Sequence, residues 1–417
     1  MINKKETMRN LSSSSHTFAA SFERSSALAF LTFCLAVLST LAIGHSDTTL
    51  APVFVTQLIV KLKYVCVIGV LLLADYRHLR MPNLMNLLLP FILFVMNVFN
   101  TPSGVSMPPS ILSVLLLLAF ALLDDVTVLR VFCYYRCYLL VMAILGIIAF
   151  VAFIFQVRIP YEIIPYYTSN ENMLYANYYF SYILFYGVND GIRLCGLFNE
   201  PGYFGTFLAL MIIIERCRSN WRTLVLFIAG CFTLSMAFFS LLVVGICLLR
   251  CSKLQMLVLF TSLLVFVFVI LPNMQFENPV LQQVVERFQY DEKSGKLTGD
   301  NRTSDDFEKI EAEFYRSNHL LLGMGTGYCH VKRGVVDTSS FRTILVEWGF
   351  LGFLVTYVFL FAVAYYIAHK DKMTLVFLFC FILSVYQRPN IFMVGYYTLL
   401  FGGILFMKQQ QGDRYNL

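Results

Sequence analysis

The chain has 417 residues, of which 58% are hydrophobic and only 13% are charged. A soluble domain is nearer half apolar, with about a quarter of its residues charged, so the composition excludes an ordinary soluble protein. Lys and Arg number 31 against 25 Asp and Glu, and they lie mostly in short loops. This excess indicates the orientation of membrane spans rather than nucleic-acid binding. The 11 cysteines lack metal-ligand spacing, and we expect no metal or other cofactor.

Long apolar runs recur along the chain and predict an all-α polytopic membrane protein. The runs are continuous rather than alternating, which excludes an outer-membrane barrel. Basic clusters between them mark the cytoplasmic loops. We expect spans at about 27–43, 52–74, 84–99, 111–123, 138–156, 201–215, 254–271, 339–366, 373–387 and 391–407.

The segment 223–249 joins two basic, hence cytoplasmic, loops through only 27 residues. Two helices of about 13 residues would each reach only about 20 Å, less than the roughly 30 Å hydrocarbon core. We therefore predict a hairpin of two short helices that turns inside the protein near Thr233, Leu234 and Ser235. With this hairpin the chain has about 12 spans and both termini in the cytoplasm.

The expected organisation follows from these spans. Its parts are a cytoplasmic tail (1–25), a membrane domain (26–271) that includes an outward loop rich in Tyr and Asn (157–200), a large outward loop (272–338), the C-terminal spans (339–407) and a second cytoplasmic tail (408–417). In the large loop, helical spacing follows Pro279, and it recurs after Ser304 at Phe307, Ile310 and Phe314. We expect this loop to form a helical periplasmic cap over the membrane domain.

The stretch RLCGLFNEPGYFGTFLAL over 193–210 places a cation, a helix start and an apolar span within a few residues of one another. A helix N-terminus carries unpaired N–H groups and a partial positive charge. Arg193 could therefore hold a pyrophosphate, with Asn199 and Tyr203 as further substrate contacts. The alternative is an arginine that snorkels to lipid headgroups. Glu200 is a candidate general base, although a carboxylate that stabilises its own helix N-terminus is favoured slightly.

The large outward loop supplies further candidates. Arg287 or Arg302 could complete a cationic clamp, although a loop arginine is more often solvated surface charge. His319 and His330 flank the GMGTGY segment, and either could accept a proton from a sugar hydroxyl. The glycines alone do not make a phosphate-binding loop, because no GK[ST] follows them.

Three cations adjoin or lie within the spans. Lys61 and Lys63 fall mid-span, where a charge is costly and is a functional candidate by default. They are two residues apart, about 200° around a helix, so only one of them can face the interior. Arg388 lies at an outward turn and could join the cationic site or contact headgroups.

The pattern R-x-x-G-x-F-x-E-P, formed by Arg193, Gly196, Phe198, Glu200 and Pro201, resembles that of the O-antigen polymerase and O-antigen ligase superfamily. The Thr-Leu-Ser break at 233–235 is similar too. So is the late loop that ends in G-x-G before the Glu-Trp-Gly of 347–349. The resemblance covers roughly residues 25–405.

The resemblance implies glycan transfer from undecaprenyl pyrophosphate on the periplasmic face of the bacterial inner membrane, without a metal. It implies that Arg193, with Arg287 or Arg302, binds the lipid diphosphate. Donor and acceptor would be lipid-linked oligosaccharides, with a flippase and a chain-length regulator as possible partners. Ligases usually carry His and Asn before the late span, where this chain has Asp-Thr-Ser-Ser at 337–340. We therefore expect a polymerase, with a ligase as the alternative and a lipid-oligosaccharide flippase or transporter as the second.

Overall fold

The computed structural model describes residues 24–41, 53–74, 115, 118–167, 172–185, 192–250, 290–291, 296–297, 305–325, 328–329, 341–368, 371–387 and 393–415. Several predictions lie outside these residues. They are the spans at 84–99 and 254–271, part of the span at 111–123, the helix after Pro279 and nearly all of the tail 1–25.

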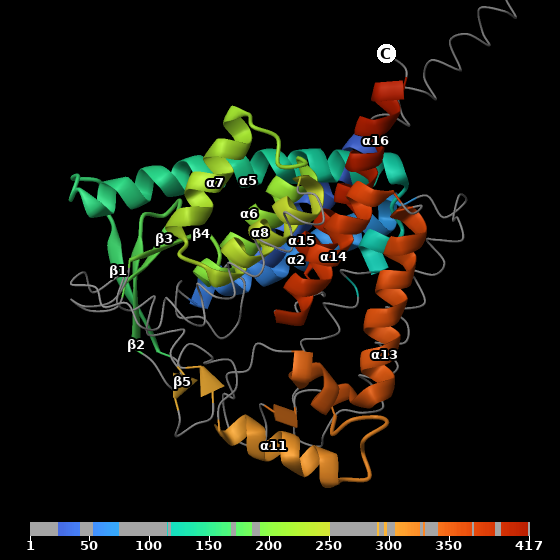
Figure 1. The fold of residues 1–417 in the computed structure, drawn as a ribbon. Coiled ribbons are helices and arrows are strands. Elements are labelled where there is room, and N and C mark those ends of the chain that lie inside the picture. Colours follow the sequence, from blue (N-terminus) through green and yellow to red (C-terminus); the bar gives the residue numbers. More distant parts are fainter. Residues whose placement is uncertain are drawn as a thin grey trace, which may run out of the picture.

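The described part of the chain is mostly helical, at 76%. Two of its helices are long and apolar enough to cross a membrane, α5 (Asp125–Ile154) and α13 (Phe341–Ala368). The other apolar helices are Arg24–Thr40, α2 (Val53–Leu73), α6 (Pro201–Ile214), α7 (Trp221–Phe232), α8 (Met236–Arg250) and α14 (Lys372–Gln387). Figure 1 shows these helices gathered into one body, with α13 running down one side of it.

The long helices each expose a stripe of large apolar side chains. On α5 the exposed residues recur at helical spacing, at Val141, Ile144, Ile148 and Val151. Small and apolar side chains on the opposite face are buried, among them Ala143, Gly146, Ala149 and Ala152. In a soluble protein the exposed face of a helix carries polar residues. The exposed face of α5 instead carries large apolar residues.

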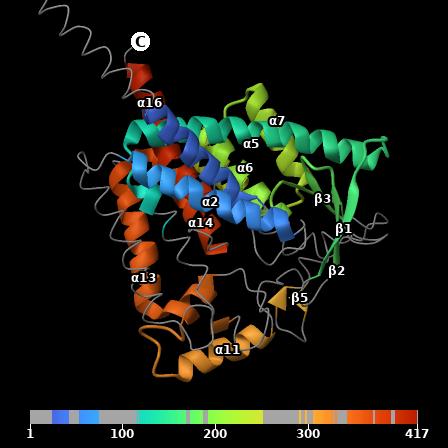
Figure 2. The ribbon, with the colours of Figure 1, turned by 180° about the vertical axis from the view of Figure 1, so that it is seen from behind.

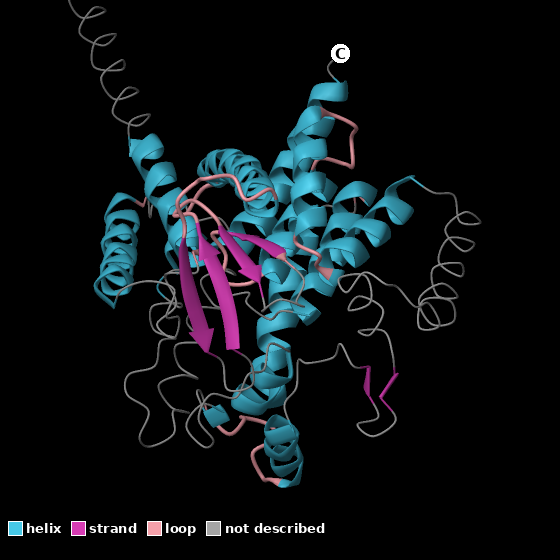
Figure 3. Ribbon diagram, turned by 90° about the vertical axis from the view of Figure 1, so that its left-hand side faces the viewer, coloured by secondary structure: helices cyan, strands magenta, loops and turns pink. Residues whose placement is uncertain are grey.

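The loop 157–200, which was expected to face outward, departs from the all-α prediction, because it folds into an antiparallel sheet. Strands β1 (Glu162–Tyr167), β2 (Asn172–Asn177), β3 (Tyr182–Phe185) and β4 (Arg193–Gly196) pair in chain order. Ile183, Ala176 and Tyr178 cluster with Ala149, so one sheet face packs on the C-terminal half of α5. Figure 3 shows the four strands beside the helices. The enrichment of Tyr, Ile and Phe in 162–167 and 172–185 is a strand signal that the prediction overlooked.

Helix α6 is the centre of the helical body, since all 14 of its residues are buried. It runs parallel to α8. A Cβ added at Gly205, near the start of α6, would lie 2.9 Å from the Ser235 Cβ that precedes α8, and one at Gly245 in α8 would lie 2.7 Å from Ile213 Cγ1 near the end of α6. These glycines allow the two backbones to approach closely, and the N-termini of the two helices therefore lie at the same end.

The hairpin of short helices is confirmed as two helices, α7 of 12 residues and α8 of 15, with a break at 233–235. The neighbouring prediction was wrong in its bounds. The span placed at 138–156 begins at Asp125, so Arg130 and Arg136 lie within α5 rather than in a loop. A 30-residue helix is about 45 Å long, enough to cross the hydrocarbon core and extend beyond it.

The last span, predicted at 391–407, is a continuous helix of three parts. It consists of α15 (Val394–Tyr397), the π-helical segment η5 (Thr398–Gly402) and α16 (Gly403–Tyr415). The helix thus runs on through most of the segment 408–417 that was expected to be a tail. In η5, a Cβ at Gly402 would lie 2.5 Å from Phe132 Cβ on α5, so the helix packs closely there.

The described part of the large outward loop contains the expected amphipathic helix. It is α11 (Asp305–Arg316), and Phe307, Ile310 and Phe314 on its inner face are fully buried. They pack with Leu345 and Val346 from the first turns of α13. Two short paired strands, β5 (Tyr290–Asp291) and β6 (Lys296–Leu297), belong to the same loop. Figures 1 and 2 place α11 and β5 below the helical body, away from α6, α7 and α8.

Candidate functional site

The Arg193–Pro201 motif forms a strand, a tight turn and a helix start. Arg193 opens β4, which ends at Gly196 with φ of 61°. This conformation favours glycine, and the Phe204 ring would lie only 3.3 Å from an added Cβ. The chain then reaches Glu200, the N-cap of α6, and Pro201 at its first position. Proline suits that position because the first N–H of a helix has no partner within the helix.

The Arg193 side chain points into the break between α7 and α8. Its Nε donates a hydrogen bond to the backbone carbonyl oxygen of Thr233 at 3.1 Å, and its Nη2 donates one to the carbonyl oxygen of Leu234 at 3.5 Å. A helix break leaves carbonyl groups without helical partners, and these must be satisfied elsewhere. Arg193 therefore has a structural role that neither sequence interpretation, pyrophosphate binding or snorkelling, included. The side chain is partly exposed, so it also borders the surface at this point.

Polar side chains within the break form hydrogen bonds with its backbone groups. Thr233 Oγ1 donates to the Gly230 oxygen at 2.6 Å and accepts from the Ser235 N–H at 3.2 Å. Ser235 Oγ in turn accepts from the Phe238 N–H at 3.4 Å, as the N-cap of a helix does. Leu234 between them has φ of 46°. The hydroxyl groups of the Thr-Leu-Ser motif thus replace the missing helical bonds.

Two helix N-termini and one guanidinium meet at this place. Helices α6 and α8 begin at the same end, and the Arg193 guanidinium lies beside the start of α8. Each N-terminus contributes a partial positive charge and Arg193 contributes a full one, while the carbonyl groups at the end of α7 that Arg193 contacts contribute a partial negative charge. An arrangement of this kind suits a multiply charged oxyanion such as a phosphate.

The other residues of the motif surround this point. Tyr175 on β2 donates a hydrogen bond from Oη to the Asn199 oxygen at 2.8 Å, which fixes the turn before α6. Tyr203 is buried in the first turn of α6. Glu200 lies at the N-cap of α6 and makes no side-chain capping bond to it. The interpretation that its charge stabilises the helix N-terminus stays a prediction.

The pKa of the buried Cys195 thiol is shifted by its burial and by two charged groups. Burial raises the pKa of its thiol to about 12, while the Arg193 guanidinium acts to lower it and the Glu200 carboxylate acts to raise it. Both charged groups are therefore near the end of β4. The structure brings together four of the predicted site residues, namely Arg193, Asn199, Glu200 and Tyr203.

Three of the remaining candidates, Lys61, Lys63 and His319, lie on other described parts of the chain. Lys63 is buried and Lys61 is exposed, so the prediction that the two lysines face opposite ways on one helix is confirmed. His319 is exposed just beyond α11, on the part of the chain that Figures 1 and 2 place away from β4. Arg287, Arg302, His330 and Arg388 lie outside the described residues.

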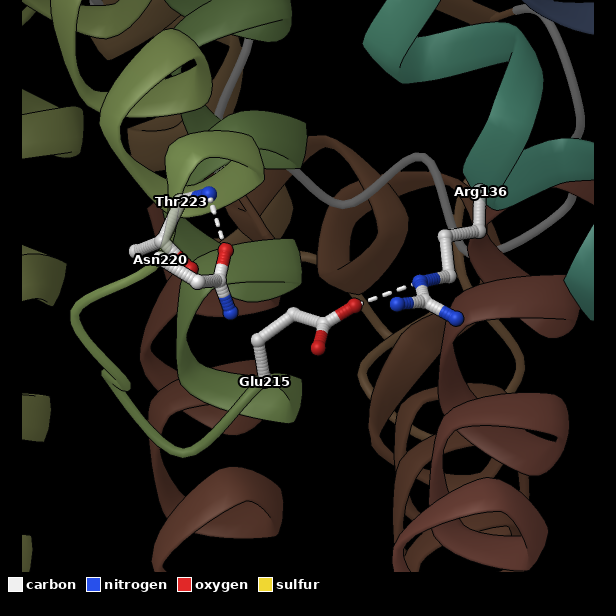
Figure 4. Close-up of polar contacts among 4 residues, drawn as sticks. All are labelled: Arg136, Glu215, Asn220 and Thr223. Atoms are coloured by element: carbon white, nitrogen blue, oxygen red, sulfur yellow. Dashed lines mark hydrogen bonds and ion pairs between the residues drawn. The ribbon is translucent and has the colours of Figure 1, made fainter.

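The sequence analysis missed an ion pair in which Glu215 is buried and Arg136 is partly exposed. Arg136 on α5 pairs through Nε with Oε1 of Glu215, which follows α6 directly (Figure 4). The Arg136 guanidinium also lies 4.9 Å from the centroid of the Phe406 ring on α16. Next to it, Arg216 donates from Nη2 to the Met407 oxygen at 2.8 Å. The signal in the sequence was a charge pair, Glu215–Arg216, directly at the end of a span.

Figure 4 also shows Asn220, whose Oδ1 accepts a hydrogen bond from the Thr223 N–H at 2.9 Å and thereby caps α7.

Among the described residues, no group of three or more His, Cys, Asp or Glu side chains is placed to hold a metal ion. No protein-family model matches the chain, and neither a curated protein nor a solved structure matches it.

Proposed function

We propose that this chain is a membrane glycan polymerase. It would transfer an undecaprenyl-pyrophosphate-linked oligosaccharide to the hydroxyl group of a second lipid-linked repeat unit, in O-antigen or capsule synthesis. The observation that carries the proposal is the position of Arg193, where the N-termini of α6 and α8 meet. That position suits a lipid diphosphate, which is both the anchor of the donor and its leaving group.

The proposed reaction is an inverting displacement. The acceptor hydroxyl attacks the anomeric carbon of the donor and gives its proton to a base, for which Glu200 is the candidate. The glycosyl–oxygen bond to the pyrophosphate breaks, and undecaprenyl pyrophosphate leaves with the bonding electrons. Arg193 and the two helix N-termini stabilise the charge that develops on the leaving group. Such a leaving group needs little protonation, so the mechanism needs no strong general acid.

A membrane setting is part of the proposal. The exposed apolar stripes of α5 and α13 support it, because large apolar side chains at helical spacing suit contact with lipid. About 12 spans, with the site facing the periplasm of the inner membrane, complete the proposed arrangement.

Two other functions remain open as alternatives. A ligase would pass the same glycan to lipid A-core or protein, and it would use the same diphosphate site. A flippase would move the lipid-linked unit across the membrane without lengthening it. The first shares the chemistry of the proposal, and the second does not.

The deciding experiment gives purified protein in sealed vesicles a lipid-linked repeat unit. The proposal expects glycans of two or more units and release of undecaprenyl pyrophosphate, with no ion gradient supplied. Translocation of the unit with no change in glycan length would overturn it in favour of the flippase. Transfer only when a lipid A-core acceptor is added would favour the ligase.

A further inference from the structure

Helix α13 is broken at Gly349, which has φ of 68° and ψ of −177°. The turns before the break, from Phe341 to Trp348, pack against α11. The part after it, residues 350–368, is about 28 Å long, close to the roughly 30 Å of a hydrocarbon core. If the apolar part of α13 crosses a membrane, the break therefore falls where the helix meets the membrane surface.

The loop that follows α11 fits into this break. Met324 and Gly325 donate N–H bonds to the Val346 and Glu347 oxygens at 2.8 and 3.0 Å. In return the Leu320 and Leu321 oxygens accept N–H bonds from Phe350 and Leu351 at 2.9 and 3.0 Å. The loop thus supplies partners for the groups that the break leaves without helical bonds, as backbone at membrane depth requires.

The same loop exposes two leucines at its tip. Leu321 is 65% exposed and Leu322 is 54% exposed. Beside them on α13 lie Phe350 and Leu351, themselves 48% and 42% exposed, and the bond between the Leu351 N–H and the Leu321 oxygen makes the two surfaces continuous. The exposed apolar surface then continues along α13 through Leu354 and Val358.

We infer that this tip of the outer loop, Leu321–Leu322, is inserted into the outer leaflet of the membrane beside α13. The occupant of the surface is lipid, because the surface is an extension of the apolar stripe on a helix that is itself long enough to span a bilayer. Exposed Tyr315 and Arg316, at the end of α11, are the residue types that favour the headgroup region.

The inference depends on α13 crossing a membrane and not on the glycan chemistry proposed above. Its consequence is that lipid holds the described part of the outer loop at the bilayer surface. Lipid-linked substrates of any kind present their headgroups at that level.

Tryptophan fluorescence tests this inference. The probe is Leu322→Trp in a Trp221→Phe chain, reconstituted in phosphatidylcholine vesicles. Ala312→Trp in the same chain is the matched control, because Ala312 lies exposed on α11 away from the buried Phe307, Ile310 and Phe314. The emission of Trp348, which is present throughout, is measured in the Trp221→Phe chain alone.

Phospholipids brominated on their acyl chains should quench the residue-322 tryptophan at least about threefold more than the residue-312 tryptophan. Aqueous iodide should show the reverse order. Equal quenching of both positions by iodide would overturn the inference, because the tip would then lie in water. Protection of the residue-322 tryptophan from both quenchers would overturn it as well, because a protein and not lipid would then cover the tip.

Discussion

Arg193 Nε donates a hydrogen bond to the Thr233 oxygen at 3.1 Å, across 40 positions of sequence. The bond joins β4, the last strand of the four-stranded sheet, to the break between α7 and α8. It also places a guanidinium beside the start of α8. Any test of Arg193 as an anion ligand must therefore separate this structural bond from a charge effect.

Three substitutions of Arg193 make that separation. Arg193→Gln keeps an amide donor for the Thr233 oxygen but removes the charge, and we expect it to retain the fold and lower glycan polymerisation by roughly 100-fold. Arg193→Lys keeps the charge but not the planar fork, so partial activity is expected. Arg193→Ala should lose both activity and about 2 kcal/mol of stability. Polymer formation and the thermal midpoint are measured together for each variant.

Wild-type polymerisation in Arg193→Gln, with a normal thermal midpoint, would show that Arg193 only satisfies the break. In that case the proposed anion site is wrong, whatever the activity of the protein. An Ala variant with low stability and no activity would not by itself distinguish the two roles.

The sequence predicted the helices better than it predicted the roles of the charges. Continuous apolar runs located α2 and α6, and helical spacing of apolar residues located α11. The short distance between two basic loops indicated the α7–α8 break. The sequence analysis missed the sheet of residues 162–196, whose strands are only four to six residues long. It also did not predict that Arg193 donates hydrogen bonds to backbone oxygens. A sequence does not reveal which carbonyl groups a fold leaves unpaired, and long-range contacts such as that of Arg216 with Met407 decide it.

The topology of the α7–α8 segment can be tested by labelling. Cysteines introduced as Arg218→Cys and Ser252→Cys should both react with an impermeant maleimide only from the cytoplasmic side, because 223–249 is too short to cross twice at full length and the flanking loops are basic. The unsubstituted chain gives the background from its own cysteines. Labelling of one site from outside would mean that the segment crosses once.

Glu215 is buried and pairs with the partly exposed Arg136. Removing one charge of this pair should destabilise the protein more than removing both. Glu215→Gln leaves the Arg136 charge without its partner, and we expect a loss on the order of 3 kcal/mol. The double variant Arg136→Met with Glu215→Leu should regain most of that stability, because neither charge is then buried. Thermal unfolding in detergent measures the stability of the single and the double variant, with Glu313→Gln, at an exposed position on α11, as the control. A single variant no worse than this control would show that the pair contributes little.

Gly323, in the loop after α11, and Gly349, at the break in α13, pack closely against each other's backbone. Gly323 has φ of 82°, and an added Cβ would lie 2.3 Å from the Glu347 oxygen. A Cβ at Gly349 would lie 2.4 Å from the Gly323 nitrogen. Either Gly→Ala change should cost roughly 3 kcal/mol or more, because it combines a left-handed conformation with a backbone clash.

The two changes should not add, because both disrupt the same contact between the loop and α13. The double variant should therefore be little worse than either single one. Protease cleavage of the outer loop in reconstituted vesicles measures the effect, with Leu354→Ala, at an exposed position on the same helix, as the control. Fully additive losses would mean that the glycines act at separate places. Cleavage no faster than in the control would mean that the loop is held without the break in α13, and that the hydrogen bonds between Leu320–Gly325 and Val346–Leu351 do not govern its position.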